Sequence, residues 1–463
     1  MACENPKTVM DVPGWPTVFE LNPGQVYQLT RTFAGKTLTR AIRLVSVTES
    51  WDPDYFTGNA QQRTLRLAEV DVDVSGIPVK LLCQPYQMPV VVNGLRLYVD
   101  MTFTWAHNVE YAPLPEMPSA IRLAVVLQEE DWGPSPFVFP IGQYLWRSSS
   151  YNNTWLSLVP YGSLYYHRGE DFGAIPDHLP VLAGLEGVVV ASPLPKGDGA
   201  SNHLILKTAN GIELRYSHMN VKTIDPSLVV GKTVRAGMEL GTTGMTCGGT
   251  LSQHFDPHLH FNIQYAGALL SAYPLVVESY FRSYPDEAIA VAGGWYYSTP
   301  GTEVHLDGSR SVARPNGRIM EYEWRLHDGR IVHAPRVKRA YEQPGLYSEE
   351  LIVRTKNGSE ARDFAQVRVY DPKQGRQIAQ GWAHYTPVRG IRPGMPVRFW
   401  NRFYNMADAV QVDFGDGSPR ETVKDCVEHK YGAPGVYVVV FCTRGSGNEP
   451  LTVKTRVAVG EAK

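Results

Sequence analysis

Five polar residues in the middle of the chain have types and spacings that suit metal chemistry. His167 and Asp171 lie four residues apart, His258 and His260 lie two apart, and His218 stands between these pairs. Imidazole and carboxylate groups are zinc ligands in enzymes, where three protein ligands leave a fourth position for water. A histidine that is not a ligand can transfer protons near neutral pH. These residue types predict a metal site if the fold brings them together.

The segments that carry these residues alternate in the manner of β-strands. Residues 258–263 alternate between polar and apolar types, which places both histidines on one strand face and the apolar residues in the core. Residues 212–218 alternate too, and they place His218 at the end of a strand on the face shared with Tyr216. Residues 167–171 are expected at a strand end. Two histidines on one face suit a metal cleft.

The order of these motifs resembles that of the lysostaphin-like (LytM-type) zinc metalloendopeptidases. The sequence has His-x-Gly-x-Asp at 167–171, Tyr-x-His at 216–218, Gly-x-x-Gly at 241–244 and His-x-His-Phe at 258–261. The similarity runs from about Pro136 to Tyr265.

The resemblance implies a role for each motif residue. His167, Asp171 and His260 would bind Zn²⁺, while His218 and His258 would line the cleft as catalytic histidines. It also implies the reaction, hydrolysis of peptide bonds in the cross-links of peptidoglycan by a metal-activated water.

The related enzymes tend to have a tyrosine that stabilises the transition state about six residues before the first ligand. Tyr161 occupies that position here, and Tyr165 and Tyr166 compete for the same role.

One segment departs from the family pattern. Residues 245–257 are longer than the usual connector and contain Cys247, His254 and Asp256. Because three ligands already suffice, Cys247 is not expected to bind the metal. We interpret five other histidines as structural or surface residues: His178, His203, His254, His327 and His429.

Length and composition predict a mostly β, multidomain protein. The 463 residues exceed one ordinary core, and 42 Gly and 34 Pro suit short strands separated by turns. We expect an N-terminal β-rich domain at 1–130, a lysostaphin-like antiparallel β domain at 131–285 and two further modules at 286–371 and 372–463.

An internal repeat defines the last two modules. The pattern Tyr-x-x-Pro-Gly-x-Tyr at 341–347 returns at 431–437, and Asp-Gly turns precede the two copies at 328–329 and 416–417. These segments resemble PKD modules, which implies two immunoglobulin-like β-sandwiches that serve as spacers or bind surface protein or glycan.

The N-terminal region carries strand patterns without assigned chemistry. Residues 95–105 alternate, which predicts one core face and one wet face. Glu69, Asp71 and Asp73 alternate with valines, and a solvated strand face is favoured over a calcium site.

Charge and hydropathy exclude several classes of function. The 44 basic and 46 acidic residues give a formal charge of −2, so there is no basic field to collect nucleic acid. No run of about 18 apolar residues predicts a transmembrane segment. Residues 1–20 show no secretory signal, although Ala2-Cys3 resembles the junction of a processed lipoprotein. An extracellular or cell-surface location is expected.

The five cysteines are too scattered for a disulfide framework. Cys426 and Cys442 could meet across neighbouring strands, but free buried thiols are favoured.

Two alternatives to a peptidoglycan hydrolase stay open. The same scaffold could act on another surface polymer, a glycan or a protein. Alternatively, the chain is a non-catalytic binding or adhesion protein, against which the intact His218 and His258 argue.

Overall fold

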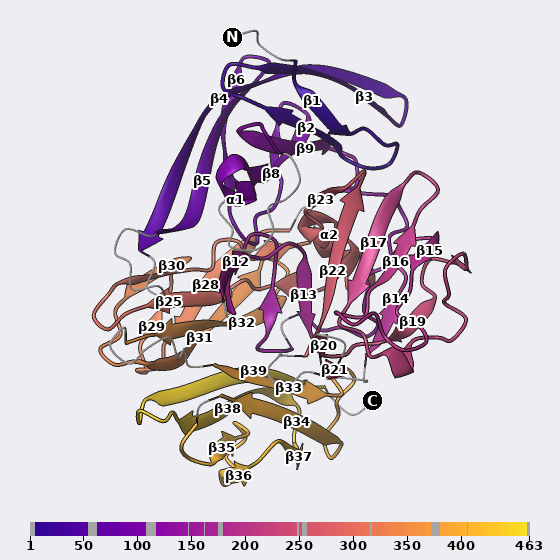
Figure 1. Cartoon of the computed structure of the whole chain (residues 1–463). Coiled ribbons are helices and arrows are strands. Elements are labelled where there is room, and N and C mark those ends of the chain that lie inside the picture. The colour runs from indigo at the N-terminus through magenta and orange to yellow at the C-terminus, as the bar shows by residue number, and fades with distance from the viewer. Residues whose placement is uncertain are drawn as a thin grey trace.

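The computed structural model describes residues 5–53, 63–107, 117–146, 148–161, 163–174, 179–247, 250–251, 257–314, 317–371, 380–404 and 406–460. This part of the chain is mostly β and multidomain, as the sequence predicts (Figure 1). Its two α-helices are α1 (Phe103–His107) and α2 (Tyr273–Ser283). Neither helix is long and apolar enough to cross a membrane.

The N-terminal part consists of two antiparallel sheets. Its strands are β1 (Lys7–Met10), β2 (Thr17–Leu21), β3 (Val26–Phe33), β4 (Lys36–Pro53), β5 (Arg63–Val74), β6 (Ile77–Cys83), β7 (Val90–Val92), β8 (Leu95–Thr102) and β9 (Ile121–Leu127). One sheet has the order β1-β2-β9-β8-β7 and the other β3-β4-β5-β6. On β5 the acidic residues at 69, 71 and 73 are half-buried and alternate with buried valines, which confirms the solvated strand face.

The prediction of a wet face on residues 95–105 is wrong. The strand β8 is buried on both faces and ends at Thr102, after which the chain turns into α1. One face packs in the N-terminal core, and the other meets the central domain, where the Tyr98 hydroxyl lies 3.0 Å from Ser271 Oγ and Asp100 accepts a hydrogen bond from the Ser271 N–H. A second domain therefore covers the face that the alternation assigned to water.

The described central part contains one large antiparallel sheet and the two-stranded pairs β11–β12, β14–β19 and β20–β21. The strands of this part are β10 (Asn152–Asn153), β11 (Leu158–Tyr161), β12 (Ser163–Tyr166), β13 (Glu170–Gly173), β14 (Pro180–Leu182), β15 (Gly187–Ala191), β16 (Leu204–Lys207), β17 (Ile212–Ser217), β18 (Thr233–Val234), β19 (Glu239–Thr242), β20 (Thr246–Cys247), β21 (Thr250–Leu251), β22 (His258–Tyr265) and β23 (Ala268–Leu270). The sheet order is β10-β13-β22-β17-β16-β15-β18, with β23 beside β22. The helix α2 packs in the apolar core on one face, where Tyr280 meets Phe139 and Trp146. The opposite face carries the polar residues of β17 and β22.

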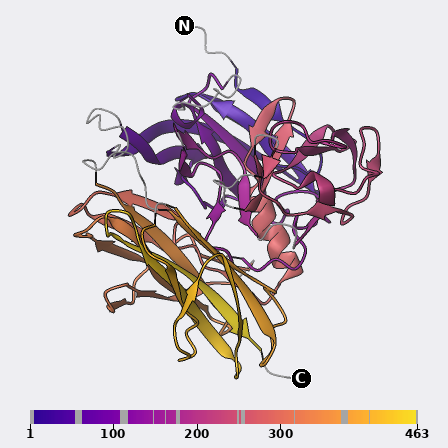
Figure 2. The same cartoon turned by 60° about the horizontal axis from the view of Figure 1, so that its bottom comes forward.

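Two modules follow, and one sheet joins them. Their strands are β24 (Ala288–Ile289), β25 (Trp295–Ser298), β26 (Val304–Asp307), β27 (Val312–Ala313), β28 (Ile319–Arg325), β29 (Ile331–Val332), β30 (Arg336–Arg339), β31 (Gly345–Thr355), β32 (Glu360–Val369), β33 (Gly381–Thr386), β34 (Pro396–Phe403), β35 (Val410–Asp413), β36 (Glu421–Val423), β37 (Cys426–Lys430), β38 (Gly435–Arg444) and β39 (Pro450–Val459). The strands β31 and β39 pair in parallel at Leu346 and Leu451, so both modules share a nine-stranded sheet. In Figure 2 the orange and yellow strands of this part run alongside one another.

The sequence repeat is also a structural repeat. The two tyrosine rings of the first copy, Tyr341 and Tyr347, have centroids 4.7 Å apart, and those of the second copy, Tyr431 and Tyr437, have centroids 4.3 Å apart. In each copy the glycine of the motif begins a long strand, β31 or β38. The same local packing therefore recurs ninety residues later, as a repeated module requires.

Cys426 and Cys442 are free thiols on strands of different sheets, β37 and β38. Cys426 is exposed and Cys442 is half-buried, so the expectation of buried thiols is wrong for this pair. The free Cys83 is buried in the N-terminal core, as expected for such a thiol.

A short segment of the central domain contacts both C-terminal modules. Ser150 N–H donates to the Ala383 carbonyl at 3.0 Å, and the Ala383 N–H donates to Ser150 Oγ at 2.8 Å. The Gln366 side chain donates to the Ser150 carbonyl, and Thr455 Oγ1 donates to the Ser148 carbonyl. Because β10 follows two residues later and pairs with β13, these modules support the edge of the sheet that carries the candidate site.

Candidate metal centre

The strand β22 brings the motif residues together from both sides. It pairs with β13, where Asp171 lies opposite His260, and with β17, where Ser217 lies opposite His260. Directly opposed residues of an antiparallel pair have Cβ atoms about 5 Å apart, so their side chains meet on the same face. Leu259 and Phe261 of β22 are fully buried in the core on the other face, which confirms the predicted alternation.

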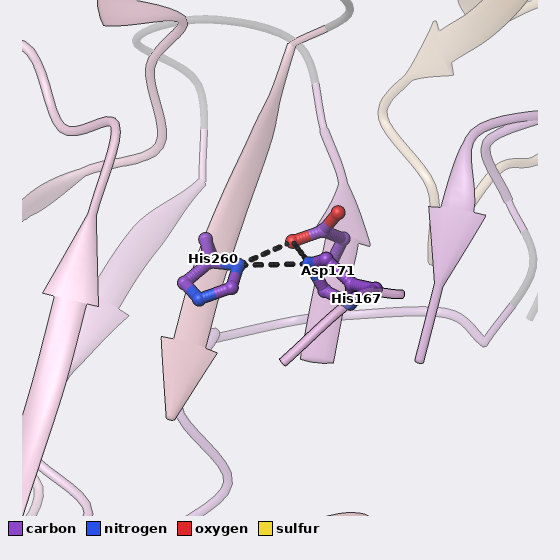
Figure 3. Close-up of side chains that lie close together, drawn as sticks. All are labelled: His167, Asp171 and His260. Atoms are coloured by element: carbon purple, nitrogen blue, oxygen red, sulfur yellow. Dashed lines mark hydrogen bonds and ion pairs between the residues drawn. The ribbon is translucent and has the colours of Figure 1, made fainter. Parts of the chain in front are cut away.

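Three side chains converge at one point on this face (Figure 3). His260 Nδ1 lies 2.8 Å from Asp171 Oδ1, His167 Nε2 lies 3.1 Å from the same oxygen, and the two nitrogens are 3.0 Å apart. His167 and Asp171 are buried, and the His260 side chain is 17% exposed, which leaves the cluster open on one side. Among the described residues, these three side chains form the group of histidine and carboxylate ligand atoms that lie close enough together to hold a metal ion.

The spacing of these atoms fits a zinc ion. Zinc binds imidazole nitrogen and carboxylate oxygen at about 2.0–2.2 Å, so tetrahedral ligand atoms lie about 3.3 Å apart. The three observed separations are a few tenths of an ångström shorter. A small outward movement of the side chains would therefore admit the ion.

His167 is held so that one particular nitrogen faces the cluster. The residue lies between β12 and β13, where its N–H donates to the Ser157 carbonyl and its own carbonyl accepts from the Leu156 N–H. The ring nitrogen Nδ1 lies 3.2 Å from the Thr154 carbonyl, an acceptor that requires a proton on Nδ1. That tautomer leaves the lone pair on Nε2, the atom that faces Asp171 and His260.

The surroundings of Asp171 and His260 favour the protonation states in which these side chains can bind a metal ion. Burial opposes ionisation of Asp171, but the charges of His167 and His258 and hydrogen bonds from His167 and His260 hold the pKa of this carboxyl well below its usual range. Burial lowers the pKa of His260 to about 4 against the opposing effect of Asp171. An ionised carboxylate and a neutral imidazole are the forms that bind a metal.

Tyr151 lies at the site although no motif pointed to it. Its hydroxyl donates a hydrogen bond of 3.0 Å to Asp171 Oδ2, the carboxylate oxygen that faces away from the histidine pair. Its ring stacks on His258 at 4.7 Å and meets Trp295 of the first C-terminal module edge-on at 5.3 Å. Tyr151 directly follows the segment that contacts both modules. No sequence motif includes this residue, so its place at the site is visible only in the tertiary structure.

Tyr151→Phe is expected to weaken zinc binding by about 10- to 100-fold, because hydrogen bonds that orient a ligand typically contribute that much to metal affinity. The variant keeps the ring that stacks on His258 and removes the donor to Asp171. The Kd for zinc, measured by competition with a chelating dye, tests this. Tyr265→Phe, on β22 of the same domain, is the matched control. Equal affinity in both variants would contradict the orienting role.

His218 and His258 lie beside the cluster on the same face. The rings of His218 and His258 have centroids 4.7 Å apart, and the centroid of His218 is 6.0 Å from that of His260. His218 Nδ1 lies 2.9 Å from the Thr246 carbonyl, so Nδ1 carries the proton and Nε2 a lone pair. Burial and the neighbouring charges of His258 and His260 hold the pKa of His218 well below its usual range. A neutral imidazole at neutral pH is suited to accept a proton.

The prediction that His218 shares the face of Tyr216 is wrong. Tyr216 is fully buried in the core, where its hydroxyl accepts a hydrogen bond from the Gly184 N–H. The strand β17 ends at Ser217, and His218 adopts φ = +68°, which interrupts the alternation and turns the side chain to the metal face. Positive φ is uncommon outside glycine, so the strand pattern of the sequence does not predict this turn.

The structure describes the three tyrosines considered for transition-state stabilisation to different extents. The backbone of Tyr161 pairs with Ser163 in the β11–β12 hairpin, while the Tyr161 side chain lies outside the described residues. Tyr166 is buried in the N-terminal core, and its hydroxyl accepts a hydrogen bond from the Leu65 N–H. Tyr166 is therefore a packing residue, and Tyr161 and Tyr165 stay as candidates.

The other residues considered from the sequence have structural surroundings where they are described. His327 bonds to the buried carboxylate of Glu349, and His429 stacks on Phe414 at 3.9 Å and bonds to Asp416. The described structure does not include the Cys247 side chain, His178, His254 and Asp256.

Two imidazoles and one carboxylate lie close enough together to hold a metal ion, and two more histidines lie beside them. Many catalytic zinc sites in hydrolases use such a set of ligands. Residues 165–271 match peptidase family M23, and residues 287–369 match the PKD domain family. The chain therefore contains an M23 peptidase domain of the LytM type followed by a PKD domain, as the motifs predict.

Similar solved structures cover part of this molecule. A candidate glycyl-glycine endopeptidase LytM from Ruminococcus gnavus is 25% identical, with a TM-score of 0.23, over 30% of this chain and 58% of its own. A zinc-containing peptidase from Vibrio cholerae is 15% identical, with a TM-score of 0.23, over 50% of this chain and 56% of its own. The chain thus spans less than two thirds of either relative. Comparison with curated proteins gives no match.

Proposed function

We propose that the protein is a zinc metalloendopeptidase that hydrolyses peptide bonds, with peptidoglycan cross-links as the substrate. The observation that carries this proposal is the buried cluster of His167, Asp171 and His260 within a domain that matches a peptidase family. Bound zinc supplies Lewis acidity, which makes water a nucleophile near neutral pH and polarises the scissile carbonyl.

The two remaining histidines supply proton transfer and stabilisation of the developing charge. The Nε2 lone pair of His218, set by the Nδ1 bond to Thr246, accepts a proton from the attacking water and passes it to the leaving amine. His258, packed between Tyr151 and His218, stabilises the negative charge that develops on the carbonyl oxygen. Tyr161 is a further candidate for this stabilisation. These roles require that the substrate lies across the polar face of the central sheet.

We further propose that the protein acts outside the cytoplasm, at the cell surface, because the proposed substrate is extracellular and PKD modules are typical of extracellular proteins. An extracellular polymer is the proposed partner, and the PKD modules hold the catalytic domain near it or bind surface protein or glycan. A net charge of −2 gives no field that would favour nucleic acid instead.

The direct test is metal analysis combined with turnover. The purified full chain is expected to hold one zinc per chain and to release new amino groups from purified peptidoglycan. Removal of the metal by a chelator should abolish the release, and added zinc should restore it. Stoichiometric zinc without new amino groups from peptidoglycan would contradict the proposed substrate, and none from any peptide polymer would contradict the peptidase itself.

A further inference from the structure

The polar face of the central sheet continues past the metal cluster to a partly exposed cation. On β17, Ser217 lies opposite His260 and Arg215 lies opposite Asn262. Two residues along a strand correspond to about 7 Å, so the Arg215 side chain rises from the same face one step away from the cluster. A peptide that crosses this face at the metal must pass close to Arg215.

In the described part of the chain, Arg215 has no carboxylate partner at ion-pair distance. Its Nη2 hydrogen-bonds to His203 Nε2, a neutral acceptor, and its buried Nε has no hydrogen-bond partner among the described residues. The nearby Asp198 uses its carboxylate to accept the N–H groups of Ala200, Asn202 and His203 at 2.7–2.9 Å. Half-buried guanidinium groups usually have a matching anion, because five donors in a fixed fork are costly to leave unpaired.

His203 holds the cation in place. Its Nδ1 lies 2.9 Å from Ser217 Oγ, so Nδ1 donates to the hydroxyl and Nε2 accepts from Arg215. Burial and the Arg215 charge lower the pKa of His203 to about 4, which keeps the ring neutral. The chain Ser217–His203–Arg215 therefore fixes the guanidinium relative to the strand position opposite His260.

We propose that Arg215 determines substrate specificity by binding a free carboxylate of the peptide, one or two residues from the bond that is cleaved. The proposal rests on the proposed peptidase function. The fork of donors matches a carboxylate, and the neutral His203 positions the guanidinium without neutralising it. The substrate class is accordingly an acidic peptide or a peptide with a free C-terminus near the scissile bond.

The test compares one pool of soluble cross-linked wall peptides before and after carbodiimide amidation of its carboxylates. Wild-type protein should cleave the untreated pool with a kcat/KM about 10- to 100-fold higher, the range expected for a charge-assisted hydrogen bond. Arg215→Gln should lose this preference while it cleaves the amidated pool as wild type does, and Arg215→Lys should recover part of it. Lys207→Gln, which removes a cation of the same sheet already paired with Glu213 at 3.0 Å, should keep the preference.

Binding, measured separately, distinguishes this inference from the proposed function. Both pools are titrated by calorimetry into the full chain in the presence of a chelator, so that no turnover occurs. Tighter binding of the untreated pool that depends on Arg215 supports the inference even if no pool is cleaved by the metal-loaded protein. Equal binding of both pools, or a preference that Arg215→Gln retains, would overturn it and leave Arg215 as a structural partner of His203.

Discussion

Asp171→Asn is expected to raise the Kd for zinc by more than about 100-fold, which exceeds the effect of removing an outer hydrogen bond to a ligand. The carboxylate oxygen Oδ1 lies within 3.4 Å of nitrogens of His167, His258 and His260, so it is the common centre of the site. The amide has nearly the same shape but no charge, and so the fold should be preserved. Zinc content after dialysis, with circular dichroism as the check on folding, measures the effect.

The matched control is Asp225→Asn, because Asp225 belongs to the same domain and accepts a hydrogen bond of 2.8 Å from the Ser227 N–H. This variant should retain one zinc per chain. His167→Ala and His260→Ala should lose the metal as Asp171→Asn does. One zinc per chain in all three of these variants would show that the metal binds elsewhere.

His218→Ala and His258→Ala are expected to keep zinc and to lower kcat by about 10²- to 10⁴-fold, the usual contribution of proton transfer or of charge stabilisation by a positioned side chain. Neither imidazole belongs to the cluster of three candidate ligands, yet the centroids of the two rings lie 4.7 Å apart beside it. Because they act on the transition state, kcat and kcat/KM should fall together while KM changes little. Steady-state kinetics with wall peptides that the protein cleaves measure kcat and KM, and elemental analysis measures the zinc content of each variant.

His305→Ala is the control for these two variants, since His305 is exposed on the first C-terminal module, far along the chain from the motifs, and hydrogen-bonds to Glu303. Its kinetics should equal those of wild type. Near-wild-type kcat in both His218→Ala and His258→Ala would refute proton transfer by His218 and charge stabilisation by His258. Loss of zinc in either one would instead make that histidine a ligand.

The types of domain in the chain could be predicted from the sequence because each pattern that indicates them involves residues close together along the chain. The alternation in residues 258–263 repeats every two residues, and this period alone decides which side chains share a face of β22. The two Tyr-x-x-Pro-Gly-x-Tyr motifs predicted equivalent strand starts at β31 and β38 for the same reason, since each motif folds within its own neighbourhood. Motif order added the metal ligands by resemblance.

The alternation of polar and apolar residues gave wrong predictions where another part of the chain packs against a strand or where the strand ends. The alternation of β8 predicted water on one face, but the central domain covers that face through Ser271. The alternation of β17 predicted that His218 shares a face with Tyr216, but Tyr216 lies in the core and a positive φ at His218 turns that side chain to the other face. Periodicity describes a regular strand, and it contains no information on where the strand ends or on what packs against it.

The sequence by itself therefore determined the family of the central domain, the repeated module and the five histidine and carboxylate residues of the site. Only the tertiary structure decided that Tyr151 orients Asp171, that His203 holds Arg215 beside the cluster, and that the two C-terminal modules share one sheet. The physical reason is that a strand's period is set by neighbours along the chain. Contacts between side chains tens to hundreds of residues apart depend on how whole sheets pack, which no single segment specifies.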